Sequence, residues 1–455
     1  MARDQIDQTP IETRDELVAW LERGIKPRSR FRVGTEHEKF AFTLSRHEPL
    51  PYAGRRSIRA LLEGMQMLLG WEPITEGPNI IGLLDVTGGG AISLEPGGQF
   101  ELSGAPLETV HQTSAELQSH LAQLREVATP LGIGFLGLGM NPKWTRAEVA
   151  SMPKGRYRIM TSYMPKVGCH GLDMMYRTCT VQANLDFSSE ADMVKKLRVG
   201  LALQPVATAL FANSPFTEGK PNGFLSYRSE IWRDTDPDRT GMLPFAFEPG
   251  MGFERWVDYA LDVPMYFVKR GDAYIDVAGQ SFRDLLAGRL SALPGERATL
   301  SDWANHLTTI FPEVRLKRFL EMRGADAGPW QRVPALAALW VGLLYDDDAL
   351  DAAWDLVRPW SAEERQKLRD DVPKLGFKAV IRGRRVLELA RDCLALARAG
   401  LTRRGRLDSD EDETIYLKPL ESFVERGITP AEELLEKFYG PWHGSVEPIF
   451  SQYAY

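Results

Sequence analysis

Two glutamates separated by one residue stand in the segment GTEHEKF, residues 34–40. Alternate side chains of a β-strand point to the same face, so Glu36 and Glu38 share a face that Phe40 continues. Carboxylates covered in this way repel each other and lose hydration unless a cation joins them. A hard divalent cation such as Mg²⁺ prefers carboxylate oxygens. The segment therefore indicates a metal site, although it equally suits a solvent-exposed strand edge.

A second acidic pair, Glu95 and Glu101, flanks the tight-turn sequence Pro-Gly-Gly at residues 96–98. If this turn folds the chain into a hairpin, the two carboxylates approach each other near one end of it. They then offer the same kind of oxygen ligands as the first pair. The alternative is an ordinary surface hairpin with no bound ion.

Polar and apolar side chains alternate along RTCTVQANLDF, residues 177–187. In a strand, one face then belongs to the core and the other is wholly polar. The amide of Gln182 or Asn184 can donate to a phosphate or carry an oxygen to a metal. The polar face indicates either the floor of an active site or a surface that is simply wet.

A carboxylate and a guanidinium share a strand face in FLEMRGAD, residues 319–326, as Glu321 and Arg323. A metal-binding carboxylate beside a phosphate-binding guanidinium suits phosphoryl transfer, and a structural salt bridge is the alternative. Other cations cluster in two polar segments, where each alone also suits a surface ion pair of little energy. These cations are Lys154, Arg156, Arg158, Arg228, Arg233 and Arg239.

Helices and strands follow one another without the regular βαβ order, and tight Gly/Pro turns join several strands. This pattern favours an α+β fold with an antiparallel sheet and helices packed on one face. Helices are predicted over residues 11–24 with Thr13 as cap, 58–69, 108–128 and 191–213, the last kinked or broken at Pro205. Strands are predicted over residues 31–42, 91–104, 133–140, 176–187, 265–269 and 319–326.

The chain has 455 residues, of which 44% are hydrophobic and 26% charged, as in ordinary globular proteins. We predict a single catalytic domain over residues 1–455, with a mainly helical region from about residue 330 packed on the sheet. The net charge of −7 argues against a general nucleic-acid binder. There is no GxxxxGK[ST] phosphate loop. No apolar run reaches the roughly 18–20 residues that span a bilayer.

Long stretches of the chain match a known family. They include GTEHEKF, SLEPGGQFELSGAPLETVHQT, MPKGRYRIMTSYMPKVG, DMMYRTCTVQANLDF and NHLTTIFPEVRLKRFLEMRGADAGPW. Over about residues 13–360 the chain closely resembles glutamate–cysteine ligases of the plant and proteobacterial type. The resemblance implies a glutamine-synthetase-like antiparallel sheet that forms a funnel. It also implies that ATP phosphorylates the γ-carboxylate of glutamate and that cysteine nitrogen then displaces the phosphate, which begins glutathione synthesis.

The resemblance also implies roles for individual residues. About two or three Mg²⁺ ions would accompany ATP. Arg323, Gln182 and Arg315 would contact ATP, although related ligases have a histidine in place of Gln182. Arg228 would act at the reaction centre and hold a substrate carboxylate. The metal ligands would be Glu36, Glu38, Glu95, Glu101 and Glu321, with Glu313 as the rival to Glu321. The amino-acid pocket would include Arg156, Met175 and Thr178.

The chain departs from plant members of that family in two ways. Its first thirty residues resemble neither a signal peptide nor an acid-poor transit peptide, which predicts a cytoplasmic location. The redox-sensitive cysteines of plant members align with Val277 and Ala292, so that redox switch is expected to be missing. The partners expected are glutamate, cysteine and ATP, with possible feedback by glutathione, no membrane, and a monomer or weak homodimer. The alternatives are a ligase for another amine and a binding protein without catalysis.

Overall fold

The computed structural model of the chain describes residues 7–455. Nine strands form the main sheet of this part, and all of their pairings are antiparallel. Eight of them lie in the order β14-β15-β7-β1-β5-β4-β3-β2. β6 is outside this order and pairs with residues 40–43 of β1. Their bounds are β1 Val33–Thr43, β2 Glu72–Glu76, β3 Asn79–Leu84, β4 Ala91–Leu94, β5 Phe100–Ser103, β6 Ile133–Leu136, β7 Thr180–Leu185, β14 Val314–Leu316 and β15 Leu320–Asp326. The predicted α+β class is confirmed.

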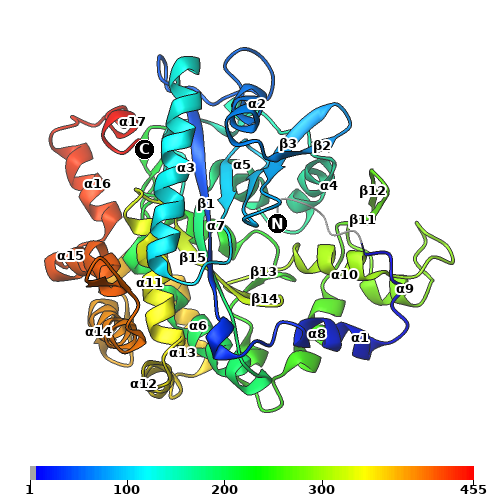
Figure 1. Ribbon diagram of the computed structural model, residues 1–455. Coiled ribbons are helices and arrows are strands. Elements are labelled where there is room, and N and C mark those ends of the chain that lie inside the picture. Colours follow the sequence, from blue (N-terminus) through cyan, green and yellow to red (C-terminus); the bar gives the residue numbers. More distant parts are fainter. Residues whose placement is uncertain (1–6) are drawn as a thin grey trace.

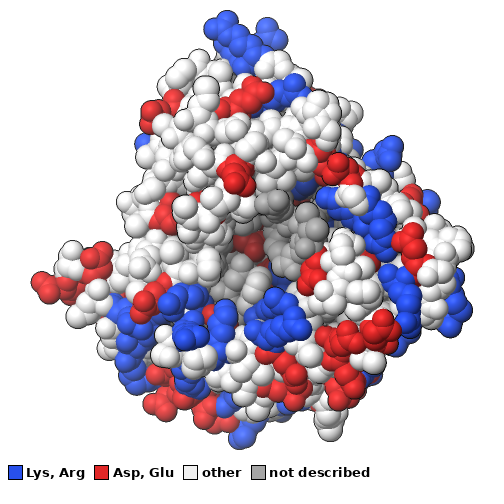
Figure 2. All heavy atoms as spheres, turned by 45° about the vertical axis from the view of Figure 1, so that its right-hand side comes forward, with Lys and Arg blue, Asp and Glu red and all other residues white. Residues whose placement is uncertain are grey.

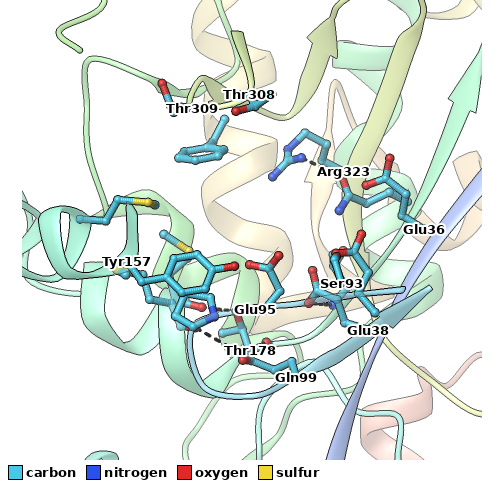
Figure 3. A pocket seen from close by; sticks show the side chains of 18 of the residues that line it. Glu36, Glu38, Ser93, Glu95, Gln99, Tyr157, Thr178, Thr308, Thr309 and Arg323 are labelled. Atoms are coloured by element: carbon cyan, nitrogen blue, oxygen red, sulfur yellow. Dashed lines mark hydrogen bonds between the residues drawn. The ribbon is translucent and has the colours of Figure 1, made fainter. Parts of the chain in front are cut away.

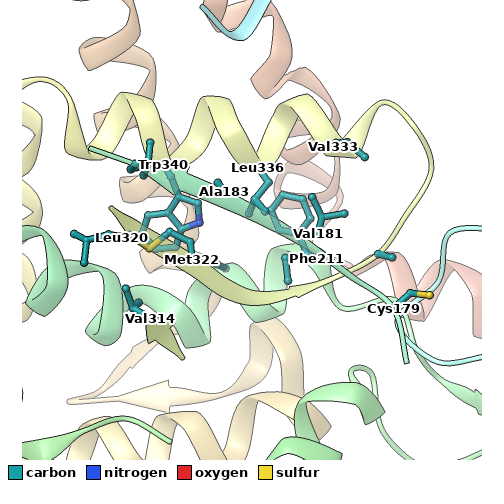
Figure 4. Close-up of a cluster of buried hydrophobic side chains, with 14 of the residues drawn as sticks. Cys179, Val181, Ala183, Phe211, Val314, Leu320, Met322, Val333, Leu336 and Trp340 are labelled. Atoms are coloured by element: carbon teal, nitrogen blue, oxygen red, sulfur yellow. The ribbon is translucent and has the colours of Figure 1, made fainter. Parts of the chain in front are cut away.

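Helices cover one face of this sheet, as Figure 1 shows. α3 packs on β1 and β6, α2 on β3, α6 on β15, and α11 on β7 and β1. Figure 4 shows the apolar cluster that α6 and α11 form with this face, including Val181, Met322 and Trp340. These helices are α2 Ile58–Leu69, α3 Val110–Leu131, α6 Glu190–Phe211 and α11 Arg332–Leu344. The opposite face of the sheet is left to shorter helices and loops.

Other helices and short hairpins complete the part of the chain that the structure describes. The remaining α-helices are α1 Arg14–Glu22, α4 Gly155–Tyr163, α5 Gly171–Arg177, α7 Tyr227–Arg233, α8 Phe253–Asp262, α9 Phe282–Leu286, α10 Leu300–Leu307, α12 Asp347–Val357, α13 Ala362–Leu375, α14 Val386–Arg404, α15 Lys418–Arg426, α16 Pro430–Tyr439 and α17 Ile449–Gln452. The other strands are β8 Phe216–Thr217 with β9 Lys220–Pro221, β10 Thr240–Gly241 with β13 Phe311–Pro312, β11 Phe267–Arg270 with β12 Ala273–Asp276, β16 Val380–Ile381 with β17 Arg384–Arg385, and β18 Leu407–Asp408 with β19 Glu411–Asp412. None of the helices among residues 7–455 is long and apolar enough to cross a membrane.

Local sequence signals explain several boundaries. Thr13 caps α1 through a capping box with Glu16, as predicted. α2 spans the predicted residues, and its C-cap Gly70 takes the left-handed conformation with φ 69°. Pro205, by contrast, does not break the chain into two helices, because α6 continues through it. β15, α12, α13 and α14 all pack on α6, and this tertiary packing outweighs the local cost of the proline.

Candidate active site

A cavity of about 140 Å³ opens on the face of the sheet that the long helices leave uncovered. Strands β1, β4, β7 and β15, the β4–β5 turn, helices α4, α5 and α7, and residues 308–311 all contribute lining side chains. Figure 3 shows Glu36 and Glu38 at one side with Arg323 beside Glu36, Glu95 in the lower middle, and Thr308 at the top. In Figure 2 the middle of the molecule is hollowed, with acidic atoms visible inside. The cavity therefore brings together side chains that are far apart in the sequence.

The sheet register places the predicted carboxylates side by side. Glu38 on β1 lies directly opposite Glu101 on β5, and Glu36 lies opposite Gln182 on β7. Glu95 follows β4 at the hairpin turn and lines the same cavity. Like charges directly opposite each other in a sheet are destabilising unless a cation joins them. The alternation of β1 and the β4–β5 hairpin, both predicted, thus produce one cluster of four carboxylates.

Burial and mutual repulsion raise the pKa of two of these carboxylates. Burial raises the pKa of Glu38 well above its usual range, and the nearby Glu95 and Glu101 carboxylates add to the rise. The pKa of Glu95 is raised to about 7, again by burial first and by Glu101 second, with Lys154 opposing. The protein itself therefore does not neutralise the cluster fully.

Neutral donors hold the carboxylates in position. The amide N–H of Thr180 donates to Glu38 (2.9 Å), and Ser93 Oγ donates to Glu101 (2.5 Å). Asn184 Nδ2 donates to Glu36 (2.8 Å). Among residues 7–455, no three acidic, histidine or cysteine side chains are gathered into a ready-made metal cage. The donor set is an open group of carboxylate oxygens with unrelieved negative charge, and it fits a hard divalent cation such as Mg²⁺.

Glu321 has a different environment from the other predicted metal ligands. It is fully buried and is not among the residues that line the cavity. Arg315 Nη2 donates to both of its oxygens (2.6 and 3.0 Å), Lys317 Nζ lies 2.7 Å from Oε2, and Arg323 Nη1 also donates to it. Burial alone would raise the pKa of Glu321, but the three cations outweigh burial and hold it well below its usual range. Both oxygens are thus already engaged, and the structure places Glu321 behind the cavity wall.

Arg323 is held at the cavity wall by this arrangement. Its Nη1 donates to Gln182 Oε1 (2.7 Å) as well as to Glu321. A β-bulge between Met322 and Ala325 inserts one extra residue into β15 against β7. The bulged Gly324 is fixed from α6, because its N–H donates to Gln204 (2.9 Å) and Thr208 Oγ1 donates to its carbonyl (3.0 Å). At the bulge Arg323 and Gly324 together oppose the single residue Gln182 of β7, between the paired residues Met322 and Ala325.

Three more arginines line the cavity. Arg228 is buried, and its Nη2 donates to the carbonyl of Arg323 (3.1 Å). Arg156 on α4 donates to Thr308 Oγ1 (3.0 Å). The Nε atoms of Arg156 and Arg315 are buried and have no hydrogen-bond partner among residues 7–455. Within the described part of the protein these two buried N–H groups are unsatisfied donors.

The β4–β5 turn is tied to α5, which orders the other end of the cavity. Gln99 Nε2 donates to the carbonyls of Met175 (3.2 Å) and Thr178 (2.9 Å). Met160 and Met174 lie beside them in the lining. Methionine side chains therefore give this end part of its apolar lining.

Most of the predicted site residues meet in this cavity. Those that line it are Glu36, Glu38, Glu95, Glu101, Arg156, Met175, Thr178, Gln182, Arg228, Arg315 and Arg323, together with Lys154. Glu321 is excluded, and its rival Glu313 pairs with Arg369 (2.8 Å) outside it. Arg158, Arg233 and Arg239 do not line it either.

Sequence reasoning missed several lining residues. Ser93, Tyr157, Trp232 and residues 308–311 were not predicted. Ser93 could have been found, because it lies two positions before Glu95 and its strand face follows from the same alternation. Residues 308–311 carry no local signal, because they come to the cavity only through the packing of a distant loop.

The chain matches the family model described as glutamate-cysteine ligase family 2 over residues 32–452. It is 58% identical to the chloroplastic glutamate–cysteine ligase of Arabidopsis thaliana over 443 residues, which cover 97% of this chain and 83% of that protein. It is 56% identical to the chloroplastic enzyme of Medicago truncatula over 452 residues, covering 99% and 87%.

A solved structure with the same fold is the glutamate–cysteine ligase of Francisella tularensis in complex with AMP. Its TM-score is 0.59 at 12% identity, with 92% of this chain and 87% of that chain covered. At that identity the likeness shows the fold alone, and it confirms the predicted glutamine-synthetase-like architecture.

The relatives correct one prediction. The composition of the first thirty residues predicts a cytoplasmic location, whereas the relatives from Arabidopsis thaliana, Nicotiana tabacum and Medicago truncatula are named as chloroplastic enzymes. The cytoplasmic prediction is contradicted by this finding and is withdrawn. The family prediction is confirmed: the match over residues 32–452 and the identity over nearly the whole chain place this protein in glutamate-cysteine ligase family 2.

Proposed function

We propose that the chain is an ATP-dependent ligase that joins the γ-carboxylate of L-glutamate to the amino group of L-cysteine, the first step of glutathione biosynthesis. The observation that carries this proposal is the single cavity in which four carboxylates lie near four arginines. Carboxylates suit the metal that accompanies a nucleotide, and guanidinium groups suit phosphate and carboxylate oxygens. The 58% identity to the Arabidopsis thaliana ligase supports the same reaction.

The reaction proceeds in two balanced steps. A γ-carboxylate oxygen of glutamate attacks the γ-phosphorus of ATP, and the bond to ADP breaks, which gives γ-glutamyl phosphate and ADP. The amino nitrogen of cysteine then attacks the acyl carbon, phosphate leaves, and the nitrogen loses a proton. In this proposal Arg323 and Arg315, with Gln182 fixing Arg323, bind phosphate oxygens.

Substrate carboxylates need counter-charges of their own. Arg228 and Arg156 line the cavity within electrostatic reach of Glu38 and Glu95 respectively, and we assign them to the α-carboxylates of the amino acids. Met175 and Thr178 border the cavity where Gln99 fixes the turn, and we assign this end to an amino-acid side chain. Correct positioning of three reactants supplies a large part of such a rate enhancement.

Glu36, Glu38, Glu95 and Glu101 are the residues that would hold Mg²⁺. Bound there, the ion would neutralise triphosphate charge and polarise the transferred phosphoryl group. Glu321 takes another role in this proposal, because its oxygens are occupied by three cations. It fixes the positions of Arg315 and Arg323 instead of binding the metal.

Incubation of the purified protein with ATP, Mg²⁺, glutamate and cysteine tests the proposed reaction. We expect equal amounts of phosphate and γ-glutamylcysteine, measured by a phosphate assay and by mass spectrometry. Phosphate release with another amine but not with cysteine would favour a ligase of different specificity. Retained ATP binding without phosphate release would favour a binding protein that has lost catalysis.

Three further assignments belong to the same proposal. We propose one catalytic domain, supported by a buried apolar cluster that is continuous from Ile11 to Phe450. We propose a monomer or weak homodimer with feedback by glutathione, which sedimentation and inhibition kinetics test. We also propose that oxidants change the rate little, because neither Val277 nor Ala292 carries a thiol.

A further inference from the structure

A second cavity lies away from the active site, between the start of α11, helices α15 and α16, and residues 452–455. Its volume is about 620 Å³, and none of its lining residues lines the catalytic cavity. Figure 1 shows α15, α16 and α17 grouped at the side of the molecule where the C-terminal end lies. A cavity of this size is large enough for a small organic molecule.

Arg332, the first residue of α11, is the unusual member of the lining. It is only 6% exposed, and its Nη1 has no hydrogen-bond partner among residues 7–455. Its guanidinium carbon lies 5.1 Å from the ring centroid of Phe423. Burial lowers the pKa of Arg332 to about 10, so the group stays protonated at neutral pH. A buried guanidinium with an unused donor is costly unless an anion joins it.

The acid in this cavity is already engaged. Glu433 is the acidic side chain among the lining residues that the structure describes. Its carboxylate accepts from Arg426 Nη2 (2.8 Å) and from Tyr453 Oη (3.0 Å), and Lys437 Nζ lies 3.4 Å away. Two cations therefore share one acid, and Arg332 adds a third positive charge. The lining side chains carry an excess of positive charge, and Asp326, which acts on Arg332 from outside the lining, offsets part of it. A bound anion would balance the remainder.

Apolar side chains form part of the remaining wall, beside the polar Gln331, Ser422 and Gln452. Trp330 is 40% exposed and lies two residues before Arg332 in the chain, and Phe423 and Pro419 line the same cavity. A bare inorganic ion would leave these rings in contact with water, whereas an aromatic or aliphatic group would cover them. We propose that this cavity binds a small organic anion, a carboxylate or a phosphate ester with an apolar group, with Arg332 as the buried counter-charge.

Calorimetric titration of the full chain tests this site with phenyl phosphate and 3-phenylpropionate as the two anionic probes. Benzyl alcohol is the neutral control, and inorganic phosphate is the anion without an apolar part. We expect saturable binding of at least one organic anion, no binding of benzyl alcohol, and weaker binding of inorganic phosphate. The stronger of the two organic probes identifies the anionic group that the site prefers.

Variants separate this site from the active site. Arg332→Met should weaken binding at least about tenfold, because it removes a charge-assisted hydrogen bond but keeps the apolar volume. Arg323→Met in the active site and Arg398→Gln, whose guanidinium pairs with Glu421 (2.9 Å) outside the cavity, should leave it unchanged. If Arg332→Met does not fold, as judged by its thermal unfolding, Arg426→Gln at the exposed rim replaces it, with a smaller expected loss.

Two results would overturn the proposal. One is the absence of saturable binding by either organic anion in the millimolar range. The other is binding that Arg323→Met abolishes and Arg332→Met leaves intact, because the probes would then occupy the active site. Equal affinity for phenyl phosphate and inorganic phosphate would contradict the role of the apolar wall.

Discussion

Two buried acidic groups lie side by side in this protein and differ in how their charge is balanced. Glu38 faces Glu101 across the β1–β5 pair, with Glu95 close by, and burial and repulsion raise the pKa of Glu38 and Glu95. Glu321 is buried more completely, yet three cations hold its pKa low. Burial acts in the same direction on both groups, so the neighbouring charges decide the outcome. The negative charge of the first group is left unbalanced, whereas the protein supplies the cations that balance the second.

We call Glu38, Glu95 and Glu101 the unbalanced group, and Glu321 with its three cations the balanced group. Removing a carboxylate from the unbalanced group should have the largest effect on activity. We expect Glu38→Gln to lower turnover by about a thousandfold or more, because a proposed metal ligand is lost while the side-chain volume is kept. Without metal its thermal stability should be unchanged or higher, since repulsion with Glu101 is relieved. Phosphate-release kinetics and thermal unfolding measure the two effects. Near-native turnover in this variant would remove Glu38 from the proposed ligands.

Removing a cation from the balanced group should act on stability instead. Lys317→Met leaves the Glu321 carboxylate less compensated in a fully buried position. We expect a loss of about 3–5 kcal/mol in the free energy of unfolding, as for other broken buried ion pairs. Chemical denaturation measures it, and Lys367→Met, which breaks an exposed pair with Asp371, is the matched control with almost no loss. A similar small loss in both variants would contradict the comparison.

The pH dependence of stability should separate the two groups further. The pKa of Glu95 is raised from 4.5 to about 7 on folding, so the folded state holds its proton more tightly. Its contribution to stability is complete below about pH 4.5 and is lost as the pH rises through 7. Because Glu95 is only partly buried, we expect the loss to be about 1–2 kcal/mol in metal-free protein.

Thermal unfolding at pH 6 and pH 8, with EDTA and then with Mg²⁺, measures this dependence. Mg²⁺ should restore more stability at pH 8 than at pH 6, because the ionised carboxylates bind it better. Glu95→Gln should flatten the pH dependence. An unchanged slope in that variant would show that Glu95 does not cause it.

The smallest effect on activity and stability is expected at Gln182, which lies between the two groups. Gln182→Ala removes one of the acceptors of Arg323 but leaves Glu321 in place. We expect KM for ATP to rise a few-fold and stability to fall by about 1 kcal/mol, the net value of one hydrogen bond. Steady-state kinetics measure the change, and a loss as large as that of Glu38→Gln would give Gln182 a direct role in the chemistry.

The sequence predicts the unbalanced group well because its causes are local. Alternation along β1 puts Glu36 and Glu38 on one face, and the turn at residues 96–98 brings Glu95 and Glu101 into one hairpin. The register that sets Glu38 against Glu101 follows once these two elements pair. The resemblance to the ligase family adds the roles, and the family itself is confirmed.

The balanced group was not predicted, because its causes are tertiary. Alternation correctly places Glu321 beside Arg323, but it does not show that Arg315 and Lys317 on the adjoining hairpin would close around the same carboxylate. The polar segment that contains Arg156 and Arg158 likewise forms helix α4, which is not among the predicted helices. The strand predicted over residues 133–140 ends at Leu136. Pro205 follows the same rule, since packing on every side keeps α6 intact.

The bulge in β15 ties catalysis to residues that no substrate touches. Gln204 and Thr208 of α6 hold the extra residue out of the ladder, and a methyl group on Gly324 would come within 2.3 Å of Gln204 Oε1. The reach of Arg323 is therefore set from the interior of the molecule, by a helix on the reverse side of the sheet. Substitutions at Gln204, Thr208 or Gly324 would therefore shift the position of Arg323 while every side chain that lines the cavity stayed the same.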